Sequence, residues 1–95
     1  MTIPQLLIHN PADNVGVVVV EGLKANTEMS CLVTADDSVF SLTVLEDVPI
    51  GHKVALRDLK TGDTAIKYGQ DIGKIVADVA KGHHVHTQNL KTKRW

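Results

Sequence analysis

The sequence predicts a small, mainly β domain in which short strands are joined by tight turns. Three observations support this class. Apolar residues make up 43% of the 95 and are largely Val, Ile, Leu and Ala, because aromatics contribute only 3%. β-Branched runs and alternating runs recur along the chain. A turn motif, Asp-apolar-x-x-Gly, recurs in the second half. We therefore expect compact, coiled short strands with at most one or two short helical turns.

The first half is expected to supply four strands. Residues 5–9 form a short apolar run, and residues 10–14 close it with a dense turn signal. Residues 14–20 are rich in Val, which is typical of a strand buried on both faces. A further strand is expected at 29–34. Residues 38–45 nearly alternate polar and apolar side chains, and this pattern predicts a half-buried strand.

The second half contains an internal repeat. Residues 47–54 match residues 78–85 at Asp, Val, Gly, His and Val, and residues 58–62 are a third, shorter copy. In each copy the aspartate can cap a turn, the next apolar residue points inward, and the glycine supplies a backbone angle that other residues avoid. A strand is expected to leave each turn. The one helical element that we expect is a single turn at 56–60.

The last strand of this series carries the best chemical candidates. Because side chains alternate along a strand, His84, His86 and Gln88 are expected on one face. In the repeat, His52 aligns with His83, so a histidine after the turn glycine belongs to the turn and is expected to be structural or solvated. His84 and His86 are not matched by histidines in the other copy, which favours a functional role for this pair.

Several roles remain open for these residues. Two imidazoles are fewer than the three or four protein ligands of a usual metal site, so a metal would need other donors. Neutral imidazoles can instead act as base and acid, since their pKa lies near neutral pH. The alternative is that these histidines are ordinary polar residues on the surface and have no function. Lys67, next to Tyr68 and a turn glycine, either ends an amphipathic strand or attracts an anionic substrate.

Composition restricts the partners and the compartment. The net charge of −1, without a basic stripe, argues against a nucleic-acid binder. No segment is long enough to span a bilayer and the N-terminus lacks a signal-peptide pattern, so no membrane partner is expected. The lone Cys31 cannot form an intrachain disulfide, which fits the cytoplasm. One domain over residues 1–95 is expected, and so short a domain needs a partner to complete a catalytic pocket.

Four segments carry a specific combination of motifs. They are residues 48–55 (VPIGHKVA), 66–69 (IKYG), 72–73 (IG) and 82–86 (GHHVH). Together they resemble the SAF domain of the altronate dehydratase family, and the resemblance covers nearly the whole chain. It implies a β-clip fold and a single SAF domain that is the small subunit of a two-subunit enzyme. It also implies a lyase acting on small anionic hydroxy acids, with a large catalytic subunit as the partner.

The same resemblance implies roles for residues. His84 and His86 match the family's His-x-His positions, so they are expected to be catalytic or metal-binding. Apart from the resemblance, Lys67, Gln88 and Asn89 are expected to bind the substrate. The family pattern usually continues with a third histidine where this chain has Gln88, so a metal site would depend more on the partner. The metal is expected to be divalent, with iron as the resemblance implies, and shared with or held by the large subunit.

Two substrate classes share one reaction plan. A base removes the proton from the carbon that bears the 2-hydroxyl, and a group then leaves from C3. That group is sulfite for (2R)-3-sulfolactate, which gives pyruvate, or hydroxide for a sugar acid such as altronate. Residues 89–95 resemble members that act on sulfolactate, so sulfite elimination is the first hypothesis. The alternatives are the small subunit of an altronate-type dehydratase and a non-catalytic binding or assembly module.

Overall fold

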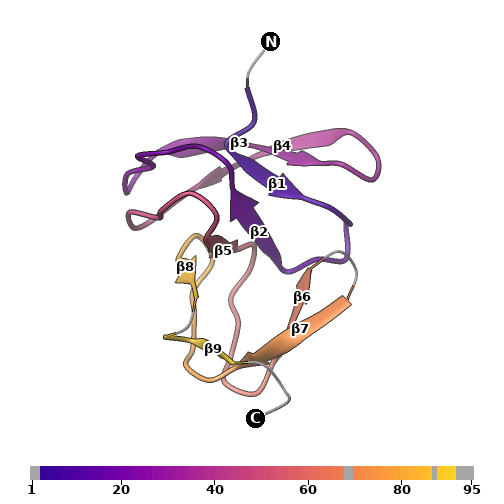
Figure 1. Cartoon of the computed structure of the whole chain (residues 1–95), viewed down its shortest axis with the longest axis vertical. Helices are drawn as coiled ribbons and strands as arrows, with labels where there is room; N and C mark the ends of the chain where they lie inside the picture. Colours follow the sequence, from indigo (N-terminus) through magenta and orange to yellow (C-terminus); the bar gives the residue numbers. More distant parts are fainter. Residues whose placement is uncertain (1–2, 68–69, 87, 92–95) are drawn as a thin grey trace.

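The computed structural model describes residues 3–67, 70–86 and 88–91. Within them, short strands form a six-stranded sheet, in the order β4-β3-β1-β2-β5-β8, and a three-stranded sheet, in the order β6-β7-β9 (Figure 1). The strands are β1 Leu6–Ile8, β2 Val15–Val18, β3 Glu28–Val33, β4 Ser38–Thr43, β5 Lys53–Ala55, β6 Thr64–Lys67, β7 Gln70–Ile75, β8 His84–Val85 and β9 Leu90–Lys91. The prediction of a mainly β domain is confirmed.

The helical turn expected at 56–60 is wrong. Leu56 donates its backbone N–H to the carbonyl of Asn14, and Leu59 forms a β-bridge with Val79, so both residues are held in extended pairing. No residue of the described part of the chain is helical. It follows that no helix able to cross a bilayer occurs there.

The central strand β2 serves two hydrophobic cores. It pairs antiparallel with β1 on one side and with β5 on the other. Val15 and Val18 are three residues apart and therefore face opposite sides of the sheet. Val18 packs into a core with β1, β3 and β4, whereas Val15 packs into a second core that reaches the three-stranded sheet. Both side chains are fully buried, so the prediction of a strand buried on both faces is confirmed for these two residues.

The repeated turns interlock in space. Each aspartate accepts a hydrogen bond from a backbone N–H of another turn rather than of its own. The pairs are Asp47 with Ala25 (2.8 Å), Asp58 with Lys81 (2.9 Å) and Asp78 with Thr61 (2.7 Å). The apolar residue that follows each aspartate is buried, as predicted: Val48, Leu59 and Val79. Side-chain caps and inward apolar residues therefore hold the turns together in pairs.

The turn glycines adopt the left-handed backbone angles that the repeat predicts. The φ angles of Gly51, Gly62 and Gly82 are 85°, 98° and 87°. At Gly82 space is also restricted, because a Cβ atom there would lie 2.6 Å from the carbonyl oxygen of Thr43. Gly82 thus fixes both the turn and the close approach of the chain just before β8.

The strand that carries the candidate histidines is shorter than predicted. β8 ends at Val85, and the chain then turns, because the carbonyl of His86 accepts hydrogen bonds from the backbone N–H groups of Asn89 (3.1 Å) and Leu90 (2.9 Å). The expectation that Gln88 continues the same strand face is therefore wrong. Gln88 instead approaches His84 across the turn.

Candidate functional site

Three histidines meet where β5 and β8 run side by side. The antiparallel register pairs Lys53 with Val85 and Val54 with His84, so His52 lies opposite His86. The ring centroids of His52 and His86 are 3.8 Å apart, and those of His84 and His86 are 5.8 Å apart with nearly parallel planes. His52 Nδ1 lies 2.8 Å from His84 Nε2. His52, His84 and His86 are called the histidine cluster below.

The rings of His84 and His86 lie together, as the sequence predicts, but His52 was missed. Its alignment with His83 suggested a shared structural role for both. The two residues differ in the structure, because His52 joins the histidine cluster whereas His83 Nδ1 contacts Glu46 Oε2 at 2.7 Å. The signal that could have found His52 is the repeat itself, since antiparallel pairing of its two copies places residue 52 opposite residue 86.

The surroundings of His84 and His86 favour uncharged rings. Partial burial and then the nearby His52 lower the pKa of His84, while the Glu46 carboxylate opposes this shift. Partial burial, His52 and Lys53 lower the pKa of His86. A neutral imidazole keeps one nitrogen lone pair for a proton or a metal ion. His84 and His86 therefore each keep such a lone pair near neutral pH.

Gln88 fixes the proton positions within the histidine cluster. Its amide nitrogen lies 3.2 Å from Nδ1 of His84, so that ring nitrogen accepts and the proton of His84 sits on Nε2. Nε2 of His84 then donates to Nδ1 of His52. One proton thus lies between the two rings in this chain.

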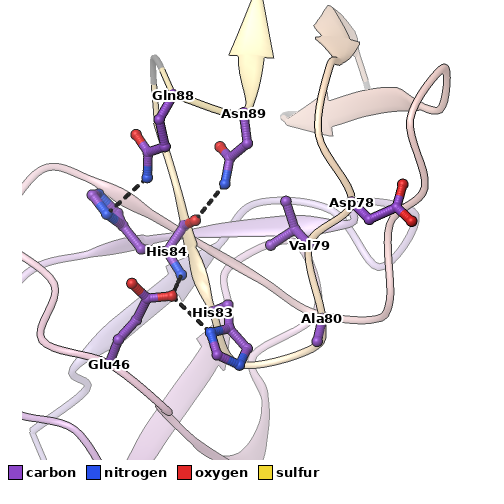
Figure 2. A pocket seen from close by; sticks show the side chains of 8 residues that line it. All are labelled: Glu46, Asp78, Val79, Ala80, His83, His84, Gln88 and Asn89. Carbon is purple, nitrogen blue, oxygen red and sulfur yellow. Dashed lines mark hydrogen bonds and ion pairs between the residues drawn. The ribbon is translucent and has the colours of Figure 1, made fainter.

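Two side chains brace the backbone that carries the histidine cluster. Asn89 donates from Nδ2 to the carbonyl of His84 (2.8 Å) and accepts at Oδ1 from the N–H of His86 (2.9 Å). Glu46 accepts from the backbone N–H of His84 (3.2 Å) as well as from His83. Figure 2 shows Glu46 and Asn89 at opposite ends of His84. The outward backbone groups of β8 are therefore satisfied within the chain.

The Glu46 carboxyl remains ionised in this position. Partial burial alone would raise its pKa, but hydrogen bonds from His83 and from the backbone N–H of His84 outweigh burial and lower the pKa. The carboxylate contacts the ring of His83 at 2.7 Å. His83 is accordingly a partner of Glu46 and no member of the cluster.

A pocket of about 370 Å³ opens beside the histidine cluster (Figure 2). It is lined by Glu46, Asp78, Val79, Ala80, His83, His84, Gln88 and Asn89. Its two carboxylates, Glu46 and Asp78, do not by themselves suit an anion. An anionic ligand here would need cationic groups from elsewhere.

The residues expected to bind substrate are separated in space. Gln88 and Asn89 line this pocket, although Asn89 is only 8% exposed. Lys67, at the end of β6, lines a different pocket of about 280 Å³ on the side of Val15 and Val17. Burial, and then repulsion from Lys67, lowers the pKa of the neighbouring Lys53. Substrate binding by these residues stays a prediction.

The donor set of the histidine cluster fits a transition-metal ion. The ligand nitrogens of its three half-buried rings all lie within 4.8 Å of one another. No other trio of His, Cys, Asp or Glu in the described ranges brings its ligand atoms so close. Three protein ligands with an open position are the usual arrangement of a catalytic zinc site, and imidazole also suits iron and nickel.

Comparison with known proteins identifies the family. Residues 4–93 match the altronate/galactarate dehydratase SAF domain. The chain belongs to this SAF domain family. Tyr68, Gly69 and residues 92–95, which contributed to the resemblance, lie outside the described residues.

Two relatives of this SAF domain are named (2R)-sulfolactate sulfo-lyase subunit alpha. The protein of Paracoccus pantotrophus is 64% identical over 67 residues, which cover 70% of this chain and 100% of that relative. The protein of Chromohalobacter salexigens is 46% identical over 89 residues, which cover 94% of this chain and 95% of that relative. Altronate dehydratase of Escherichia coli is 42% identical over 80 residues, which are 84% of this chain but only 15% of the dehydratase.

The SAF domain is thus found both as a short separate chain and as a small part of a much longer one. In this SAF domain Gln88 stands where the family resemblance implies a third histidine. His52 brings a third imidazole to the same place from β5. The departure at Gln88 therefore leaves the number of clustered imidazoles at three.

Proposed function

We propose that this chain is the small subunit of a lyase that eliminates sulfite from (2R)-3-sulfolactate and leaves pyruvate. The observation that carries the proposal is the match, over 100% and 95% of their own lengths, to two relatives named as the alpha subunit of that lyase. The altronate-type dehydratase is less favoured, because that relative is more distant and is matched over 15% of its length.

A large catalytic subunit is the partner in this proposal. The word subunit in the relatives' names and the long chain of the fused dehydratase both support it. The open pocket supports it too, because its own carboxylates do not suit a substrate with a carboxylate and a sulfonate. The partner would supply the missing cations and close the pocket. The cytoplasm is the proposed compartment, since Cys31 is a free, buried thiol whose pKa burial raises to about 11.

The reaction removes one proton and one sulfite from the substrate. A base takes the proton from C2, the C2–C3 double bond forms, and sulfite leaves from C3 with the electrons of the carbon–sulfur bond. The enol that remains takes a proton at C3, and its C2 hydroxyl loses a proton, which gives the 2-keto acid pyruvate. The C2 proton is weakly acidic, so the developing negative charge must be stabilised.

The histidine cluster contributes neutral imidazoles to this chemistry. His84 and His86 have lowered pKa values, so either can accept a proton at a ring nitrogen near neutral pH. Gln88 is exposed and can donate from its amide to a substrate oxygen. Lys67 and Asn89 are the other proposed substrate contacts. A divalent metal, with iron as the expected ion, would supply Lewis-acid stabilisation of the enediolate charge, with His84 and His86 among its ligands.

Co-expression with the large subunit tests this proposal. The purified pair should release sulfite and pyruvate from (2R)-3-sulfolactate, whereas this chain alone should release neither. Altronate is the matched competing substrate under the same conditions. Formation of a keto-deoxy sugar acid from altronate, without sulfite release from sulfolactate, would assign the chain to a dehydratase instead.

A further inference from the structure

We infer that the histidine cluster is a complete three-ligand metal site that this small chain forms by itself, with His52 as the third ligand. The proposed function leaves open whether the partner holds the metal. The use of the metal in catalysis rests on that proposed function, but binding by this chain does not. The site would take a first-row transition-metal ion and leave a coordination position open for an oxygen ligand.

The strongest geometric argument is the direct approach of two ring nitrogens. Nδ1 of His52 and Nε2 of His84 are 2.8 Å apart, so a proton must lie between them. Two nitrogens bound to one tetrahedral metal, each at about 2 Å, lie roughly 3.3 Å apart. If the distance between these two ring nitrogens increased by about half an ångström, a metal ion could therefore take the place of the proton. The stacked ring of His86, which directly follows β8, is the third donor.

The backbone that presents these rings is already fixed. His52 immediately precedes β5, His84 begins β8, and the two strands are hydrogen-bonded in register. Asn89 bonds the backbone of both His84 and His86, and Glu46 bonds the N–H of His84. Metal binding would therefore order little new chain.

The ligand chemistry selects the class of ion. The histidine cluster offers three imidazoles and no carboxylate. Mg²⁺ and Ca²⁺ prefer oxygen ligands, so they do not suit this site. Zn²⁺, Fe²⁺, Co²⁺ and Ni²⁺ accept imidazole well.

With a metal on Nε2 of His84, the proton of that ring moves to Nδ1, and Gln88 must then present its carbonyl oxygen to that N–H. Gln88 is therefore a positioning residue for His84.

Metal titration of the purified full-length chain tests the inference directly. Calorimetry with Zn²⁺ and absorption with Co²⁺ should each give one ion per chain at neutral pH. His52→Gln, His84→Gln and His86→Gln should each weaken Zn²⁺ binding by about 10- to 100-fold or more. His9→Gln is the control and should bind within about twofold of the parent chain, because His9 contacts Thr34 outside the cluster.

Two results would overturn the inference. One is a parent chain that binds neither Zn²⁺ nor Co²⁺, and the other is a His52→Gln variant that is folded and binds as tightly as the parent. Sulfite release by the two-subunit complex could still be observed in either case, so the proposed function would survive. Conversely, if this chain bound one metal ion tightly but the complex released no sulfite, only the proposed function would be contradicted.

A second measurement needs no substitution and so does not depend on variants that fold. Diethyl pyrocarbonate modifies accessible imidazoles, and mass spectrometry locates the modified residues. Saturating Zn²⁺ should slow the modification of His52, His84 and His86 and leave the rate at His9 unchanged. Equal rates with and without Zn²⁺ at the three clustered histidines would contradict the inference.

Discussion

The side chain of Asn89 makes the backbone hydrogen bonds that a neighbouring strand would otherwise make with β8. β8 is the edge strand of the six-stranded sheet, and its outward N–H and C=O groups would otherwise face solvent or pair with another chain. The Asn89 carboxamide donates to the carbonyl of His84 and accepts from the N–H of His86, and the residue is 8% exposed. The position of the two rings therefore depends on a residue that carries no ring itself.

Asn89→Ala should destabilise the chain by about 2 kcal/mol, because it leaves two partly buried backbone groups without partners. Urea unfolding measures this loss. Gln88→Ala is the matched control on the neighbouring exposed residue and should change the free energy of unfolding by less than about 0.5 kcal/mol. Equal effects of the two substitutions would show that the carboxamide of Asn89 does not brace the strand.

Asn14 makes the same kind of bridge between the two sheets. Its Nδ2 donates to the carbonyl of Thr64 (2.8 Å), and its Oδ1 accepts from the N–H of Ile66 (2.7 Å). It is 6% exposed and directly precedes β2. Both bridging asparagines are therefore the kind of buried polar residue that persists only when every hydrogen-bonding group is satisfied.

The turn elements decide where the strand with the histidines begins. Gly82 directly precedes His83 and adopts a left-handed φ of 87°. Its N–H donates to the carbonyl of Ala55, and its own carbonyl accepts from Leu45 (both 2.9 Å). The turn at Gly82 thus ties β5 to the segment that carries Glu46. A substitution at Gly82 should therefore displace the histidine cluster.

Gly82→Ala should cost about 3 kcal/mol, because the new Cβ combines a strained φ with a contact of 2.6 Å to the carbonyl oxygen of Thr43. Gly62→Ala has a similar φ of 98° but meets nothing within 4 Å, so it should cost only about 1 kcal/mol. Thermal and urea unfolding of the two variants measure the difference. Equal losses would show that the backbone angle alone matters and that the space around Gly82 is not restricted.

The sequence could predict the turns but not their pairing. Asp, the apolar residue and Gly each have a local preference, so the motif is visible without the fold. Which turn an aspartate caps depends on contacts between distant segments, as Asp58 and Lys81 show. The same limit hid His52, whose place opposite His86 is set by the register of β5 and β8. It also hid the end of β8, where the backbone N–H groups of Asn89 and Leu90 bond the carbonyl of His86.

At the scale of the whole molecule, the histidine cluster lies between two parts that fold around separate cores. Figure 1 shows β5 and β8 in the middle, between the β1–β4 layer and the three-stranded sheet. Val54 of β5 belongs to the first core, and Ala55 and Val85 belong to the second. The strands that carry the cluster are thus anchored in both cores. The site should therefore lose its geometry only when the whole chain unfolds.

The free energy of unfolding should decrease as the pH falls, in two pH ranges: an upper window set by histidines and a lower window set by aspartates. The pKa values of His84 and His86 are lowered, so the unfolded chain binds more protons, and the loss begins as pH falls through their ordinary value of 6.5. Hydrogen bonds lower the pKa values of Asp47 and Asp78, so their contribution is present above the ordinary value of 3.8 and is lost as pH falls through the lower folded pKa values.

Urea unfolding across neutral and acid pH checks both windows. A His84→Gln, His86→Gln double variant should flatten the upper window and leave the lower one, whereas Asp47→Asn with Asp78→Asn should flatten the lower window only. A free energy of unfolding that increases as the pH is lowered from neutral toward the range in which carboxyl groups titrate would contradict the sign of the histidine pKa shifts.

The complete enzyme should depend on His86 far more than the isolated fold does. Its ring is half-buried and outside both cores, so His86→Ala should cost the chain about 1 kcal/mol or less in unfolding free energy. In the two-subunit complex the same variant should lower kcat for sulfite release by at least about 100-fold, as the loss of a proton-transfer group or of a metal ligand does. His9→Ala, whose ring contacts Thr34 outside the histidine cluster, is the control with unchanged kcat. Full turnover by a folded His86→Ala complex would place His86 on the ordinary surface and remove the histidine cluster from the reaction.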